Sequence, residues 1–135
     1  MIEMTLEVAD RAARAALAKA ASMGIAMTVS VVDEAGRLVL TMKGNGTGFL
    51  TTETSRAKAV ASAAFRRSTR EMVEGAKTNP AFWGAVPTVA RGEMLPSTGA
   101  VPILAGGRVI GAIGCGGGSP DQDHECAQAG AEAVG

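Results

Sequence analysis

Apolar residues in the first part of the chain recur every three or four positions. Between residues 6 and 20 they form one face of a predicted helix, with Thr5 placed to cap it and Gly24 placed to end it. Residues 25–33 then alternate between two sets that are both apolar or small, which is typical of a central strand covered on both faces. A second strand is predicted over residues 37–43, so the two strands form a hairpin with a short glycine-containing turn.

Helical periodicity returns after a glycine-rich segment. One helix is predicted from Thr51 or Thr52, either of which can cap it, to about Phe65. Another begins at Ser68, where the pattern Ser-Thr-Arg-Glu matches a capping box. Residues 78–98 show little periodicity and contain three prolines, so a long loop is predicted there. Loops of this length in a compact domain are often functional.

The last part of the chain predicts a second hairpin and a final helix. Strands are expected over residues 99–105 and 108–115, joined by a two-glycine turn, and Pro102 predicts that its strand lies at an edge or is bulged. Ser119 is a good N-cap for the final helix. The order is therefore α-β-β-α-α-β-β-α. We expect residues 1–135 to form a single α+β domain, with an antiparallel sheet of about four to five strands flanked by helices.

Composition and charge narrow the possible partners. The 135 residues include thirteen basic and thirteen acidic side chains, so the basic surface that binds nucleic acid is not expected. No apolar run is long enough for a membrane span, and no secretory signal is visible, so we expect a cytoplasmic protein.

Cys115 and Cys126 match no disulfide framework or zinc motif, and no metal site is expected. Zero net charge and an alanine-rich surface favour a homo-oligomer.

The most specific local feature is the glycine turn that joins the last strand to the last helix. Gly116, Gly117 and Gly118 leave their amides open to a ligand, and the following helix N-terminus favours an anion or a carboxylate. The alternative is a tight turn that serves packing alone.

Three polar residues on the middle helix are a second candidate. Arg56 or Lys58 would supply a cation for a ligand carboxylate, or Arg56 simply pairs with Glu53 on a solvated face. His124, the only histidine, shares a polar stripe with Asp121, which favours a surface residue over a ligand.

Several motifs, kept in order along nearly the whole chain, resemble the GlcG/HbpS-like family, which includes the C-terminal domain of PduO-type proteins. They are Thr5-Leu6-Glu7, Val29-Ser30-Val31-Val32-Asp33-Glu34-Ala35-Gly36, Arg56-Ala57-Lys58-Ala59, Val101-Pro102-Ile103, Gly111-Ala112-Ile113-Gly114 and Ser119-Pro120-Asp121-Gln122-Asp123. The resemblance implies an antiparallel sheet flanked by helices and symmetric oligomers. Some members of the family bind haem, and others are encoded beside catabolic enzymes.

Two hypotheses follow from this resemblance. In the first, the protein binds haem or another tetrapyrrole. Arg56 or Lys58 would meet the propionates, and Phe82, Trp83 and Met94 would cover the ring. The candidates for an axial ligand are Cys115, Met94 and His124.

In the second hypothesis, the protein is an enzyme or accessory protein of a catabolic pathway that acts on a small organic acid. The glycine-turn amides and a cation would hold the acid, with Glu53 or Asp33 for proton transfer. Ser97 and Thr98 stand where relatives often have a glycine-rich stretch, so we add their hydroxyls to the ligand-binding candidates.

Overall fold

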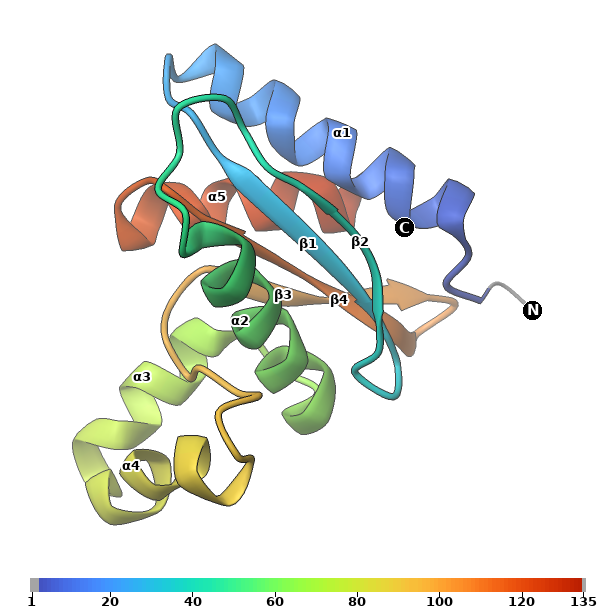
Figure 1. The fold of residues 1–135 in the computed structure, drawn as a ribbon. Coiled ribbons are helices and arrows are strands. Elements are labelled where there is room, and N and C mark those ends of the chain that lie inside the picture. The colour runs from blue at the N-terminus through green and yellow to red at the C-terminus, as the bar shows by residue number, and fades with distance from the viewer. Residues whose placement is uncertain (1–2, 135) are drawn as a thin grey trace.

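A computed structural model describes residues 3–134, which form five helices and four strands (Figure 1). In chain order the elements are α1 (Leu6–Ser22), β1 (Thr28–Asp33), β2 (Leu38–Met42), α2 (Thr51–Phe65), α3 (Thr69–Thr78), α4 (Pro80–Val89), β3 (Ala100–Ala105), β4 (Arg108–Gly116) and α5 (Pro120–Glu132). The predicted α+β class and the order of elements are confirmed, with one helix added.

The two predicted hairpins form a single antiparallel sheet in the order β2-β1-β4-β3. The hairpins join through β1 and β4, whose register pairs Thr28 with Gly116 and Asp33 with Gly111. β3 is an edge strand, so Pro102 costs the sheet no central hydrogen bond, and a register shift follows it after Ile103. The sheet thus has a buried centre made of β1 and β4, as the pattern of residues 25–33 predicted.

Helices cover both faces of the sheet. α1 and α5 lie side by side on one face, and α2 lies on the other (Figure 1). The α1–α5 contact is close because small residues line it. A Cβ added to Gly130 would lie 2.7 Å from the carbonyl oxygen of Ala12 and 2.5 Å from Cδ1 of Ile113. The buried face of α1 consists of alanines: Ala9, Ala12, Ala13, Ala16 and Ala20.

The predicted loop over residues 78–98 is wrong in its first half, where α4 forms and packs against α3. Pro80 occupies the first turn, where its missing N–H costs nothing, and Pro87 stands in the last turns of the helix. The predicted cap of α2 is also wrong. Its N-cap is Leu50, without a side-chain bond, and Thr51 Oγ1 instead lies 2.8 Å from Thr28 Oγ1 on the sheet.

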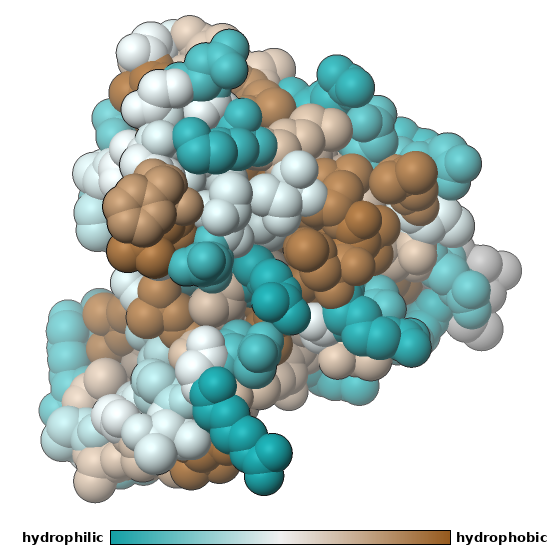
Figure 2. Space-filling model, viewed as in Figure 1, coloured by the Kyte–Doolittle hydropathy of each residue, from teal (hydrophilic) through white to brown (hydrophobic). Residues whose placement is uncertain are grey.

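Apolar side chains remain on the surface over β2 (Figure 2). Leu38 is 45% exposed, and Phe49, in the loop before α2, is 84% exposed. Self-association stays a prediction, and these residues are part of the exposed apolar surface that could take part in it.

Candidate functional site

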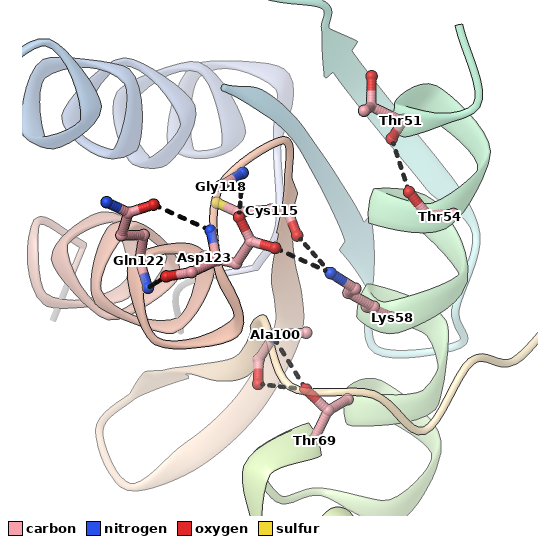
Figure 3. Close-up of polar contacts among 10 residues, drawn as sticks. Thr51, Thr54, Lys58, Thr69, Ala100, Cys115, Gly118, Gln122 and Asp123 are labelled. Carbon is pink, nitrogen blue, oxygen red and sulfur yellow. Dashed lines mark hydrogen bonds and ion pairs between the residues drawn. The ribbon is translucent and has the colours of Figure 1, made fainter. Parts of the chain in front are cut away.

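Lys58 and Asp123 form a buried ion pair between α2 and α5 (Figure 3). Lys58 Nζ lies 3.1 Å from Asp123 Oδ2 and donates to the carbonyl oxygen of Cys115 at 3.0 Å. The second carboxylate oxygen of Asp123 accepts the amide of Gly118 at 2.9 Å. The two side chains are only 9% and 5% exposed, so this polar cluster ties α2, the end of β4 and α5 together.

Burial dominates the electrostatics of this cluster. It raises the pKa of Asp123, while Lys58 and the Gly118 amide oppose that shift by favouring the carboxylate. Burial also raises the pKa of the Cys115 thiol well above its usual value. Gly99 is required beside the cluster. Its φ is +141°, and a Cβ there would lie 2.9 Å from both Lys58 Nζ and the Cys115 carbonyl oxygen.

The glycine turn is adjacent to this cluster, and side chains of α5 accept hydrogen bonds from the amides of Gly118 and of the following Ser119. Gly118 donates to Asp123, and the Ser119 amide donates to Gln122 Oε1 at 2.9 Å, which completes the capping box predicted at Ser119 (Figure 3). An anion that binds the Gly118 amide would have to displace the buried Asp123 carboxylate. Anion binding at Gly116–Gly118 stays a prediction, and the Gly118 amide already has an acceptor within the fold.

Two of the predicted site residues meet at a separate cavity. Glu53 and Arg56 line a space of about 260 Å³ together with Ala57, Gly92 and Glu93. Arg56 Nη2 pairs with Glu93 at 3.2 Å, and its Nε is buried without a hydrogen-bond partner. Lys58, two residues further along α2, instead faces the buried cluster. The structure therefore separates the two cations that the sequence grouped.

Asp33, the other predicted proton carrier, stabilises the β1–β2 turn. Its Oδ1 accepts the amides of Ala35 and Arg37 at 2.9 Å each, and Oδ2 pairs with Arg37 Nε. Because Asp33 and Thr28 are at opposite ends of β1, Asp33 is far from the glycine turn beside Gly116.

The aromatic and hydroxyl candidates do not line one site. Trp83 on α4 packs against Phe65 and Phe82, with ring centroids 5.0 Å away in each case. Met94 packs on the core cluster around Val32 and α2. Ser97 and Thr98 are half-buried in the segment that leads into β3.

The largest described cavity lies elsewhere, between the start of α3, β3 and α5. It measures about 500 Å³ and is lined by Arg66, Arg67, Ser68, Arg70, Glu71, Val101, Pro102, Leu104, His124 and Gln128. A second cavity of about 290 Å³ shares Pro102, Leu104 and Gln128 with it and adds Ala131 and Glu132. We call the two together the α3–α5 groove. One end of this groove is rich in arginine, and the other end is largely apolar.

The arginine end contains donors without partners. No side-chain partner is found for Arg66 or Arg67 among residues 3–134, whereas Arg70 pairs with Asp121 at 2.8 Å. His124 Nδ1 is buried and lacks a hydrogen-bond partner. Burial, and then Arg70, lower the pKa of His124, so its imidazole is neutral at neutral pH.

Two hydrogen bonds hold the arginine segment in place. The Ser62 hydroxyl donates to the Arg67 carbonyl oxygen at 2.8 Å. The Ala100 amide donates to Thr69 Oγ1 at 3.0 Å (Figure 3). The sequence pattern predicted the helix cap at Ser68 in this segment but no ligand site. Its signal is three arginines within five residues, on both sides of the helix-capping Ser68.

Fold and groove together define a small α+β protein whose surface groove has an arginine-rich end and a largely apolar end. The chain belongs to the haem-degrading HbpS-like family, whose model matches residues 4–132. The resemblance inferred from the sequence is thereby confirmed.

Solved structures share the whole fold. A double mutant of Streptomyces reticuli HbpS is 29% identical, with a TM-score of 0.89 over 100% of this chain and 89% of that chain. The PduOC:haem complex is 24% identical, with a TM-score of 0.88 over 98% of this chain and 96% of that chain. An uncharacterised 15.0 kDa protein of Citrobacter freundii, from the dhaT-dhaS intergenic region, is 28% identical over 93% of this chain and 87% of its own length.

No helix within residues 3–134 combines the length and hydropathy required to cross a membrane.

Proposed function

We propose that the protein binds haem or a related tetrapyrrole in the α3–α5 groove. The observation that carries this proposal is the polarity of the groove, with unpartnered arginines at one end and apolar residues at the other. A tetrapyrrole has the same polarity, because its propionates lie along one edge of an apolar ring. The family membership and the haem complex of PduOC support the same ligand class.

The candidate axial ligands differ in how well they suit haem. Cys115 is completely buried and its pKa is raised, so it offers no thiolate. Met94 is partly buried, packs against the core cluster around Val32, and does not line the groove. His124 lines the groove, and its lowered pKa favours the neutral imidazole that can bind a metal. When bound, haem supplies an iron centre that takes imidazole as a ligand. In this proposal His124 holds the iron, and Arg66 and Arg67 hold the propionates.

Haem titration followed by the Soret band tests the proposal. We expect a saturable shift that is lost in His124→Ala and weakened about tenfold by Arg66→Gln or Arg67→Gln, since a charge-assisted hydrogen bond contributes roughly 1.5–3 kcal/mol. Arg56→Gln is the matched control, because Arg56 lines the other cavity. A Soret shift that is unchanged in folded His124→Ala and in both groove arginine variants would overturn the proposal.

A small organic acid at Arg56 and Glu53 is the second candidate function. Arg56 Nε is buried without an acceptor, and Glu53 has no partner among the described residues and could exchange a proton with a bound acid. In this case Arg56→Gln, and not the groove variants, abolishes binding of a short carboxylate such as glycolate, measured by calorimetry.

A further inference from the structure

We infer that the arginine end of the α3–α5 groove also binds compounds that carry two or more linked phosphoryl groups. Phosphate binding there does not depend on the proposed function. Only one part of the inference rests on it: such compounds would compete with the tetrapyrrole for Arg66 and Arg67, and would thereby regulate its binding.

The charge of the cavity favours a multivalent anion. Its lining contains three arginines and one acidic residue, Glu71, although the chain as a whole has zero net charge. Arg70 is partly neutralised by Asp121, whereas Arg66 and Arg67 have no acidic partner among the described residues. Two uncompensated charges on neighbouring residues suit a ligand whose own charges are covalently held close together.

The backbone places these charges at the cavity. Arg66 adopts a left-handed conformation, with φ 57° and ψ 39°, and it ends α2. This conformation is uncommon for a side chain other than glycine, asparagine or aspartate. The turn brings Arg66 and Arg67 to the same cavity as Arg70, and the Ser62–Arg67 hydrogen bond fixes it.

The chemistry of guanidinium explains why phosphoryl groups fit. A planar guanidinium donates two parallel hydrogen bonds to one phosphoryl group, so two arginines can each hold one group of a linked pair. The cavity also lies at the start of α3, where the helix dipole adds a partial positive charge. At about 500 Å³ it has room for a diphosphate or triphosphate.

Calorimetric titration of the whole chain with sodium tripolyphosphate, at constant ionic strength, tests the inference. We expect tripolyphosphate to bind at least tenfold more tightly than orthophosphate. Arg66→Gln and Arg67→Gln should each weaken it about tenfold. Arg11→Gln, on the exposed surface of α1 and outside the groove, should leave the affinity unchanged. Circular dichroism checks that each variant is folded.

Two results would overturn the inference. One is equal affinity for tripolyphosphate in the parent and in the folded Arg66→Gln/Arg67→Gln variant. The other is citrate binding as tightly as tripolyphosphate, which would show that the site recognises charge alone. A parallel titration with ADP shows whether the site prefers a nucleotide to inorganic pyrophosphate. If ADP binds more tightly than pyrophosphate, the groove also contacts the nucleoside.

Haem titration with and without tripolyphosphate separates this inference from the proposed function. If tripolyphosphate binds through Arg66 and Arg67 but no Soret shift occurs with haem, the proposed function fails and the phosphate site stands. If haem binds through His124 and tripolyphosphate does not bind, the phosphate site fails and the proposed function stands. If the proposed function and the phosphate site are both right, we expect competition, so haem should bind more weakly in the presence of tripolyphosphate.

Discussion

Replacing Lys58 by methionine should destabilise the protein strongly. The substitution keeps most of the side-chain volume but removes the ammonium group that lies 3.1 Å from Asp123. The carboxylate of Asp123 is then left 5% exposed, with the Gly118 amide as its remaining partner. Removing one member of a buried ion pair costs roughly 3–5 kcal/mol, because the other charge stays buried without compensation. For a chain of 135 residues that corresponds to a fall in Tm of about 10–18 °C.

Urea unfolding of Lys58→Met and of Lys58→Met/Asp123→Leu measures this cost. The double variant removes the orphaned charge. It leaves the Gly118 amide without its acceptor, which costs roughly 1–3 kcal/mol, while the Cys115 carbonyl oxygen loses the Lys58 donor in both variants. We therefore expect it to be more stable than Lys58→Met alone. The defect of Lys58→Met should also shrink at acid pH. Without Lys58, which lowers the pKa of Asp123, that carboxyl takes up a proton more readily. A loss below about 1 kcal/mol in Lys58→Met, the median for exposed pairs, would refute the reasoning.

Other predictions concern packing, titration and thiol access. Gly130→Ala should cost about 1–3 kcal/mol in urea unfolding, because its Cβ would meet the α1 backbone. By contrast, Gly84→Ala on α4, where a Cβ meets nothing within 4 Å, should stabilise by about 0.5–1 kcal/mol. The pKa of His124 is lowered in the fold, so below pH 6.5 the unfolded chain binds more protons. Acidification from pH 6.5 should therefore lower the Tm of the parent more than that of His124→Gln. Both cysteines are buried, and the pKa of the Cys126 thiol is raised to about 11. Neither Cys115 nor Cys126 should therefore react with a disulfide reagent at pH 8 until the protein is unfolded.

Most helices, strands and turns of the fold could be predicted from local patterns in the sequence. Ser68 and Ser119 cap the helices that they were predicted to cap, and the two glycines at positions 106 and 107 form the turn of the second hairpin with φ of 58° and 79°. These features depend on residues a few positions apart, so periodicity and turn chemistry suffice to find them. α4 was missed because residues 78–98 show little periodicity and contain three prolines, one of which, Pro87, lies inside the helix although it cannot donate a backbone hydrogen bond there.

The candidate site depends on contacts between distant parts of the chain, which local patterns do not encode. Lys58 and Asp123 are far apart in the sequence, and only the packing of α2 and α5 on opposite sides of β4 brings them together. Lys58 was therefore predicted as a ligand-binding cation, although the fold itself uses its charge. The α3–α5 groove likewise takes residues from three separate segments, including Pro102 and His124. Its arginines were visible in the sequence, but their common cavity was not.

The sheet order has a consequence for how the chain reaches its native state. Each hairpin joins neighbouring strands and can form early, because its loop is short. The central pairing of β1 with β4 must wait for a segment near the far end of the chain, and α1 must wait for α5, the last helix. Until β4 and α5 have left the ribosome, one edge of β1 has no strand partner and the alanine face of α1 lacks α5, so the unfinished chain exposes a strand edge and apolar surface that favour aggregation.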